Sequence, residues 1–490
     1  MRKTNRVTLF LLVCMLLVSC LAGCGKKDPP PDVPGSSDGA ADEEAYDWGG
    51  EEFTFMEREL NPSVSIYYEV YAEGEKGEII NDALFRRNLL IEDTFNVTLV
   101  SKVESANNTT RRDTVTNILN SGDDVYSALM DYGGNTMSYA VNGYLRDLND
   151  FDAFDFGNSY WYSETMEDTQ ISGKNAFAVG DICTASYTAT CVIYFNKSLA
   201  QEYLLDDIYD TVFAGEWTFE EFSTVGKDVT QDLNGDGMDE NDQYMLAAAN
   251  WAYQPYFYGQ GYQLLSEDAD GNPAIGSLRE EQYDALKAII DLCNSEDCWY
   301  LGKYGTDDMG TTDVFLGERA LFWAQLMVSA GKLRNASFDF GILPLPKRDT
   351  SQQRYVSYLH TNTSLVSIPI TNQKAARTAI LVERMCRENE RMIKPQYFDA
   401  LFDGIIVRDP ESTQTLDIIY DNVFMDMVQP LVHVGGTIDT ALRNLMDIGM
   451  SDAIVTSWER QVERTDSVLK DIIKAYEDKI VSRPEGGDAA

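Results

Sequence analysis

Apolar and polar residues recur along the chain with periods that predict strands and helices in turn. Alternation at every second position predicts a strand, and apolar spacings of three and four predict an amphipathic helix. Beyond residue 50 the predicted strands are 52–56, 97–103 and 125–131, and the predicted helices are 78–95, 111–120 and 135–141. Strands that alternate with helices at this spacing indicate βαβ units and a mainly parallel sheet, so the predicted fold class is α/β.

The later part of the chain continues the same patterns. A strand is predicted at 245–249, and a long amphipathic run covers 452–478. Thr218 precedes an apolar run and is followed three residues later by Glu221, a pattern typical of a helix N-terminus. A chain of 490 residues is too long for one ordinary core, so we expect two or three packed units.

The charge balance excludes some classes of partner and chemistry. The chain has 39 Lys and Arg against 80 Asp and Glu, a formal net charge of −41. A protein that binds nucleic acid needs a basic surface, so we expect no nucleic-acid partner. The two histidines, His360 and His433, are too few for most zinc or iron sites and disfavour a Ser-His-Asp triad. A carboxylate-only enzyme is not excluded by composition.

The first 24 residues predict the compartment. A basic start, MRKTNR, precedes an apolar run at 7–18 that is short for a membrane span. The run ends in Leu21-Ala22-Gly23-Cys24, which resembles a bacterial lipobox, whose cysteine carries a diacylglycerol. We therefore expect a signal peptide at 1–23, a lipid anchor on Cys24 at the extracytoplasmic face of the cell membrane, and a flexible tether at 24–50. The alternative is a plain N-terminal anchor helix.

Five cysteines remain after the anchor, so at least one must be free. Cys293 and Cys298 are separated by four residues in a polar turn, and an oxidising compartment would allow a disulfide between them. The sequence leaves open whether that disulfide forms. Cys386 lies in an apolar helical pattern and is expected to be a buried thiol.

Five short blocks follow one another in a distinctive order. They are Ile171–Gly180 (ISGKNAFAVG), Cys191–Lys197 (CVIYFNK), Gly215–Phe222 (GEWTFEEF), Phe315–Leu321 (FLGERAL) and Phe340–Lys347 (FGILPLPK). In this order, behind a lipobox, they resemble the family 1 extracellular solute-binding proteins, the carbohydrate receptors of ABC importers. The similarity covers roughly 53–475, and it departs from the family at Gly180, where a proline is common.

The resemblance implies a two-lobe, type II periplasmic-binding-protein-like fold with a hinge and a cleft between the lobes. Ligands of open α/β sheets bind beyond the carboxyl ends of the strands, and hinge closure buries them. The resemblance also implies a monomer that binds a sugar or oligosaccharide and delivers it to ABC transporter permease subunits. The expected division is 50–180 plus 335–370 for lobe one, 190–330 plus 380–430 for lobe two, and 440–480 for C-terminal helices packed across both.

An acidic, glycine-containing loop predicts a structural calcium site. Residues 232–242 read DLNGDGMDEND, which places oxygen ligands at loop positions one, three and five and a glycine, Gly237, at position six. Position twelve is Gln243 rather than the bidentate Glu of a true EF-hand, so another carboxylate must complete the shell. The candidate ligands are Asp232, Asn234, Asp236, Met238 through its carbonyl, Glu240 and Asp242. The alternative is an acidic turn without an ion.

The ligand site of a sugar receptor needs aromatic rings for the C–H faces and amides or carboxylates for the hydroxyls. Five aromatic residues crowd the segment 251–258, which follows a predicted strand. The candidates are aromatic residues near this segment or polar residues in loops that follow strands and cross the cleft: Glu57, Arg58, Asp131, Tyr132, Asn135, Tyr187, Trp251, Tyr253, Trp323, Gln325 and His360. For each ring, core packing is the alternative, and for each loop residue the alternative is an exposed position.

Two other classes of function stay open. A surface glycosidase needs two carboxylates at matched spacing, and 80 acidic residues always allow such a pair to be imagined. An adhesion or structural lipoprotein would be expected to contain repeats, and none is found. The order of the five blocks behind the lipobox favours the transport receptor over both.

Overall fold

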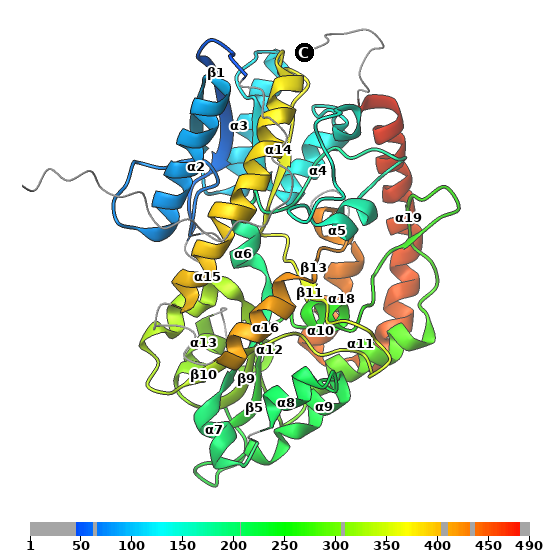
Figure 1. The fold of residues 1–490 in the computed structure, drawn as a ribbon. Coiled ribbons are helices and arrows are strands. Elements are labelled where there is room, and N and C mark those ends of the chain that lie inside the picture. The colour runs from blue at the N-terminus through cyan, green and yellow to red at the C-terminus, as the bar shows by residue number, and fades with distance from the viewer. Residues whose placement is uncertain are drawn as a thin grey trace, which may run out of the picture. The chain divides into compact units, whose positions relative to one another are not determined.

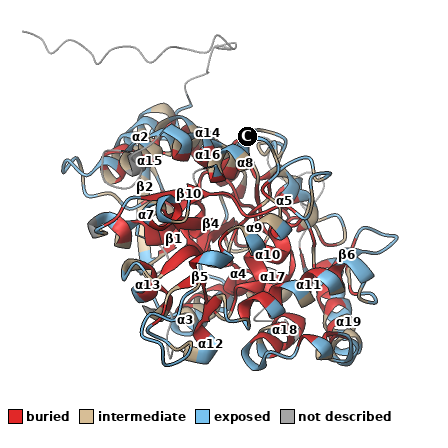
Figure 2. Ribbon diagram, turned by 90° about the horizontal axis from the view of Figure 1, so that it is seen from below, coloured by how far each residue is buried: buried red, intermediate tan, exposed pale blue. Residues whose placement is uncertain are grey.

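The computed structural model describes residues 46–61, 66–205, 207–304, 309–402, 410–431 and 437–480. These residues form a mixed α/β unit with two larger β-sheets and helices packed around each (Figure 1). Figure 2 shows buried residues concentrated in strands such as β1, β4 and β5, whereas the outer sides of helices such as α2 and α3 are exposed. The expected α/β class is confirmed.

The first sheet has four strands in the order β12-β3-β1-β2. β1 (Glu51–Arg58) is parallel to β2 (Val97–Glu104) and to β3 (Ala128–Tyr132), so the carboxyl ends of all three meet at one edge. β12 (Ser364–Ser367), from much later in the chain, runs antiparallel beside β3. The three strands and the helices between them agree with the predicted elements to within about three residues.

Helices cover the first sheet. Asn107 caps the first turn of α3, because its side-chain Oδ1 accepts the backbone N–H of Thr110 at 3.0 Å. α14 packs against α2 and lies beside it in Figure 1. The helices of this part are α2 (Ile79–Phe95), α3 (Asn108–Ser121), α4 (Gly133–Val141), α14 (Ala375–Met392) and α15 (Lys394–Phe402).

The second sheet has five strands in the order β10-β4-β9-β5-β8. Every residue of its central strands is buried, which explains why these strands read as continuous apolar runs rather than alternating ones. β4 is antiparallel to β10 and β9, and β5 is parallel to β9 and β8. The strands are β4 (Cys191–Asn196), β5 (Tyr244–Ala248), β8 (Cys298–Tyr300), β9 (Ala320–Leu326) and β10 (Phe340–Leu343).

Short helices surround the second sheet. The predicted cap at Thr218 is confirmed, because its hydroxyl accepts the N–H of Glu221 at 3.2 Å. The helices of this part are α7 (Lys197–Glu202), α8 (Ile208–Phe213), α9 (Phe219–Val225), α10 (Tyr253–Gly259), α11 (Glu280–Cys293), α12 (Leu301–Tyr304), α13 (Met309–Leu316) and α16 (Pro410–Tyr420).

Within the described residues, three segments that pass between the two sheets are hydrogen-bonded side by side. Thr190, just after α6 (Ala185–Ala189), forms an antiparallel bridge with Leu359. β11 (Ser357–Tyr358) pairs in parallel with β13 (Val423–Phe424), and the N–H of Leu359 donates to the carbonyl of Phe424 at 2.8 Å. Bundled connections of this kind allow two lobes to rotate about a common hinge.

The long C-terminal helix contacts both parts of the unit. α19 (Ile454–Lys479) packs against α4 beside the first sheet and against α11 beside the second. The Nζ of Lys174 donates to the carbonyl of Tyr476 at 2.8 Å and so ties the end of α19 to an early loop. The remaining elements are α5 (Ser163–Asp168), α17 (Val428–Leu431), α18 (Thr437–Ile448), β6 (Ser266–Glu267), β7 (Pro273–Ala274) and 3₁₀ helices at Leu148–Asp150, Lys227–Val229, Met327–Asn335 and Ser451–Ala453.

Two elements lie in a different part from the one expected. We placed 335–370 with the first lobe, but β10 at 340–343 pairs with β4 and belongs to the second sheet. We placed 380–430 with the second lobe, but α14 at 375–392 packs on α2 beside the first sheet. The chain crosses between the sheets after β10 rather than before it, a detail that periodicity does not reveal.

None of the described helices combines the length and apolarity needed to cross a membrane.

Candidate functional site

The carboxyl edge of the first sheet borders a polar pocket. Arg58 ends β1, is half-buried, and donates through Nη2 to the carbonyl of Asn362 at 2.5 Å. The pocket has a volume of about 420 Å³. Its lining consists almost entirely of hydrogen-bonding side chains, namely Arg58, Glu59, Asn61, Asn107, Asn108, Thr109 and Asn362, with Ala106. Such a pocket, at the carboxyl ends of parallel strands, is where ligands of open α/β sheets bind.

Tyr132 ends β3 at the same edge and is buried. Burial raises the pKa of its phenol, while a hydrogen bond with Thr361 and the charges of Arg443 and Arg58 act in the opposite direction. The next residue is Gly133, where a Cβ atom would come within 3.3 Å of the Thr361 hydroxyl. The glycine therefore allows the end of β3 to approach the crossing segment closely.

Aromatic residues from the second sheet reach the same crossing segment. Trp251 follows β5, and its indole ring meets the His360 imidazole edge-on at a centroid distance of 5.6 Å. The hydroxyl of Tyr253, at the start of α10, donates to Oδ1 of Asp439 on α18. Trp251 and Tyr132, which follow strands of different sheets, thus converge on residues 360–361.

A partly buried ion pair between Asp439 and Arg443 completes this cluster. Nε of Arg443 lies 3.0 Å from Oδ2 of Asp439, one helical turn away on α18. Gln254 bridges the pair, because its Nε2 donates to Asp439 at 2.8 Å and its Oε1 accepts from Arg443 at 3.2 Å. The Asp439 carboxylate is thereby satisfied, while the Arg443 side chain keeps 30% of its surface exposed. Arg443 therefore keeps donor capacity at the edge of the cluster.

His360 is held in its neutral form. Burial, together with the positive charge of Arg443, lowers the pKa of His360 to about 3. Its Nδ1 accepts the backbone N–H of Asn362 at 3.1 Å, which places the imidazole proton on Nε2. A neutral imidazole with a defined donor suits recognition of a hydroxyl oxygen.

Three of the predicted polar residues instead support the first sheet. Glu57 is fully buried and accepts the backbone N–H groups of 69, 70 and 71 at 2.8, 3.1 and 2.8 Å. Asp131 pairs with Nε of Arg111 at 2.6 Å and accepts the Tyr139 hydroxyl at 2.9 Å. Asn135 donates to the carbonyl of Asn108 at 3.0 Å and to Asp131 at 3.2 Å. These contacts fix the carboxyl edge of the first sheet and leave the three side chains with protein partners.

Three further candidates lie in the interior. Trp323 on β9 has no exposed surface and stacks on Phe315 at 5.3 Å. Gln325, on the same strand, is buried and accepts the backbone N–H of Leu326 at 2.9 Å. Tyr187 on α6 stacks on Tyr397 at 5.2 Å. β9 is a central strand covered on both faces, so its side chains pack in the core rather than at the cleft.

Sequence reasoning missed the polar partners of the cluster. Asp439 and Arg443 come from a helix near the C-terminus, and their only signal is a spacing of four residues that brings an acid and a base onto one helix face. Gln254 lies within the aromatic segment that drew attention to Trp251. His433 lies outside the described residues.

The predicted calcium loop forms a tight exposed turn. Gly237 has φ of 101°, as a glycine at position six requires. The Asp232 carboxylate accepts the N–H groups of Gly235 and Gly237 at 2.6 and 2.8 Å, and these bonds lower its pKa. Asp242 is buried and accepts the N–H of Leu233 at 2.9 Å. Across the described ranges, no group of three or more His, Cys, Asp or Glu side chains is gathered for a metal ion.

The described cysteines are buried free thiols: Cys183, Cys191, Cys293, Cys298 and Cys386. Cys293 and Cys298 lie within hydrogen-bonding distance of each other, and burial is the main cause that raises the pKa of Cys298. Cys386 is buried in its helix as expected. Cys24 lies outside the described residues.

Comparison with solved structures identifies the fold. Over 85% of this chain and 99% of the other, it superposes on an ABC substrate-binding protein, Lmo0181 of Listeria monocytogenes in complex with cycloalternan, with a TM-score of 0.54 and 12% identity. UspC of Mycobacterium tuberculosis gives a TM-score of 0.56 at 13% identity, over 85% of this chain and all of that one. UgpB of the same organism, in complex with glycerophosphocholine, gives 0.53 at 16% identity, over 86% and 98%.

These similarities show that the chain has the two-lobe fold of solute-binding proteins, as the resemblance in the sequence predicts. The identities lie between 12 and 16%, so the similarity extends to the fold alone. No known sequence family and no curated protein matches the chain.

Proposed function

We propose that the chain is a family 1 extracellular solute-binding protein that captures a sugar or oligosaccharide between its lobes and delivers it to an ABC importer. One observation carries the proposal: Tyr132 from the first sheet and Trp251 from the second converge on the crossing residues His360 and Thr361. A ligand held there contacts both lobes at once, and contact with both lobes is what couples binding to closure.

The chemistry around this point favours a hydroxylated ligand. The Trp251 ring offers an apolar face against which a sugar ring can stack. Neutral His360, the Arg58 guanidinium and the asparagines of the adjoining pocket supply donors and acceptors for hydroxyl groups. Carbohydrate is therefore the class of ligand that we assign.

The hinge supports a receptor rather than a rigid scaffold. The three crossing segments are joined by backbone hydrogen bonds, while the contacts between the lobes around Trp251 are made by side chains. Rotation about the crossing segments would open the cleft without breaking either sheet. We propose that the protein acts as a monomer and leaves its ligand chemically unchanged.

The site of action would be the outer face of the cell membrane. Lipidation of Cys24 and the tether at 24–50 would keep the body close to the permease while leaving it free to turn. Changing Cys24 to Ala should release the protein or leave an unprocessed precursor. A mature N-terminus at any residue other than Cys24 would contradict the anchor.

Calcium in the loop at 232–242 remains part of the proposal. The turn at Gly237 fits the ion, and Asp232, Asn234, Asp236, Glu240, Asp242 and the Met238 carbonyl would hold it. Since these groups are not gathered in the way a metal centre requires, the ion would have to draw them inward. Its role would be to stabilise this loop beside β5.

A thermal-shift screen tests the proposed function. The mature chain is heated with individual monosaccharides and oligosaccharides, and a ligand of the native state should raise its melting temperature. Trp251→Ala should reduce the shift, while a matched change at an exposed position, Tyr46→Ala, should retain it in full. A panel that leaves the wild-type melt unchanged would contradict the carbohydrate assignment.

A further inference from the structure

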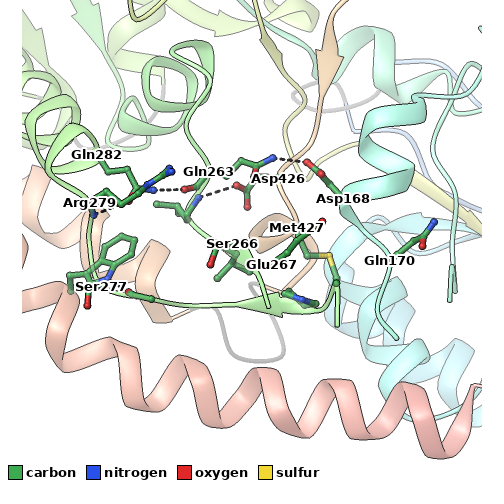
Figure 3. Close-up of a pocket in the computed structure, with 16 residues that line it drawn as sticks. Asp168, Gln170, Gln263, Ser266, Glu267, Ser277, Arg279, Gln282, Asp426 and Met427 are labelled. Atoms are coloured by element: carbon green, nitrogen blue, oxygen red, sulfur yellow. Dashed lines mark hydrogen bonds between the residues drawn. The ribbon is translucent and has the colours of Figure 1, made fainter. Parts of the chain in front are cut away.

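A second pocket lies away from the cleft residues described above. It has a volume of about 470 Å³. Four parts of the chain form it: the end of α5 and the residues after it, the stretch from Gln263 to Gln282, the segment that precedes α17, and α19. Figure 3 shows Gln263 extending to Asp168, with Asp426 beside it. None of the residues that line this pocket belongs to the cluster around His360.

Three carboxyl groups line the pocket, those of Asp168, Glu267 and Asp426, and Asp426 is the most deeply buried of them. Asp426 is 2% exposed, and its two oxygens accept the N–H groups of Val428 at 2.7 Å and Leu264 at 3.1 Å. Burial is the main cause that raises the pKa of Asp426 to about 7, and the charges of Asp168 and Asp439 add to it. A buried carboxylate that meets only backbone dipoles and other acids is costly to ionise.

Asp168 is also a carboxyl whose pKa is raised by burial and by nearby acids. Its Oδ2 accepts Nε2 of Gln263 at 2.6 Å. Burial is the main cause that raises the pKa of Asp168 to about 6, the hydrogen bond from Gln263 lowers it, and the charges of Glu267 and of two acids on α5 raise it further. The charged groups that act most strongly on the two carboxyls are thus all acidic. Arg279, an exposed residue, also lines the pocket, so three acidic groups face one basic group and the lining keeps a net negative charge.

The rest of the lining suits an organic molecule. The Trp458 ring lines the pocket, and its Nε1 donates to the carbonyl of Gly276 at 2.9 Å, which fixes the ring's orientation. Nε2 of Gln282 donates to the carbonyl of Gln263 at 2.8 Å, and this bond links two lining residues from the two ends of the 263–282 stretch. An indole face attracts cations as well as apolar groups. A metal ion is a poorer fit, because the described residues gather no set of three ligating side chains.

We propose that this pocket binds a small organic cation, with a protonated amine between Asp168 and Asp426 and its carbon skeleton against Trp458. The amine would supply the positive charge that the two carboxylates lack, and its N–H groups would donate charge-assisted hydrogen bonds to them. The site does not depend on the cleft, and it would exist whether or not the cleft binds carbohydrate.

Isothermal titration with cyclohexylamine and with cyclohexanol tests the proposal, because the two probes share one ring and differ in charge. We expect cyclohexylamine to bind at one site per chain and cyclohexanol at least tenfold more weakly, as the loss of a charged hydrogen bond implies. Asp168→Asn, Asp426→Asn and Trp458→Phe should each weaken cyclohexylamine binding about tenfold. Asp168 is only half-buried, so its variant decides the outcome if Asp426→Asn does not fold.

The matched control addresses the chain's net charge of −41, which attracts any cation. Glu463→Gln removes the same charge from an exposed position on α19, the helix that carries Trp458, and should leave binding unchanged. Equal affinity for the two probes, a lack of saturable binding of cyclohexylamine at millimolar concentrations, or unchanged binding by the folded Asp168→Asn variant would each overturn the proposal. So would an equal loss in Glu463→Gln.

Discussion

The indole of Trp251 and the imidazole of His360 meet with ring centroids 5.6 Å apart and planes inclined at 61°. Trp251 follows β5 of the second sheet, and His360 lies on the segment that leads from β11 into β12 of the first. The contact therefore joins the second lobe to one of the segments that cross between the lobes. A ligand bound as we propose would contact or displace this pair.

Replacing Trp251 with Ala should weaken ligand binding about tenfold or more. Loss of one stacked ring removes roughly 1–2 kcal/mol by analogy with aromatic packing. The measurement is the Kd of the saccharide that the thermal-shift screen identifies. Trp251 keeps 8% of its surface exposed, so its loss should cost less stability than that of a wholly buried ring.

Trp323→Ala is the contrasting control. Trp323 is wholly buried against Phe315 in the core of the second lobe, so its loss should cost roughly 3–5 kcal/mol of unfolding free energy. Denaturant unfolding of the two variants separates a cleft ring from a core ring. If Trp251→Ala unfolds as readily as Trp323→Ala, or binds like the wild type, Trp251 is not a ligand residue.

Asp131→Asn should destabilise the fold without a direct effect on the cleft. Removing the charge leaves Arg111 buried without its partner, which costs roughly 3–5 kcal/mol when an interior ion pair is broken. Chemical denaturation measures the loss. A variant that keeps wild-type stability but no longer binds saccharide would show instead that Asp131 contacts the ligand.

The order of strands and helices around the first sheet could be predicted from periodicity, because each strand there alternates or is bounded by clear turns. The crossing point after β10 could not, since β10 is an apolar run that fits either sheet equally well. The same limit applies to Trp323 and Trp251. Both are aromatic residues near strand ends in sequence, and only the position of β9 in the middle of its sheet separates core from cleft.

The polar residues of the candidate site could not be predicted from the sequence for a different reason. Glu57 and Asp131 were expected in loops that follow strands, but each is the second-last residue of its strand. A carboxylate at that position can face the cleft or the backbone beside it. Asp439 and Arg443 lie almost two hundred residues from Gln254, their partner across the cluster. Such long-range pairs leave no local pattern.

His360 should stay uncharged through the physiological pH range. Its pKa of about 3 in the folded protein lies below the ordinary value of about 6.5. As the pH falls, the unfolded chain takes up the imidazole proton at a higher pH than the folded protein does. The contribution of His360 to stability is therefore present above about pH 6.5 and is lost as the pH falls toward 3. NMR of a His433→Gln protein, which keeps His360 as its single imidazole, should show the neutral form down to about pH 5. Titration of His360 near pH 6.5 would contradict its burial in the cluster.

Chelation should lower the melting temperature if calcium occupies the loop at 232–242. A metal at a hundredfold excess over its Kd stabilises the native state by roughly 3 kcal/mol. Asp232→Ala and Asp236→Ala should each remove the part of the melting temperature that is sensitive to chelator, whereas Asp152→Ala, at an exposed position elsewhere, should retain it. A wild-type melt that does not change after the metal is fully stripped would show that the loop is only a turn.

The central claim is that the protein binds a saccharide without altering it. Native mass spectrometry of the mature chain with the saccharide from the screen, followed by recovery of that saccharide, tests this most directly. We expect one ligand per chain, released with its original mass after denaturation. Recovery of a cleaved or otherwise modified saccharide would contradict the receptor and point to a surface enzyme.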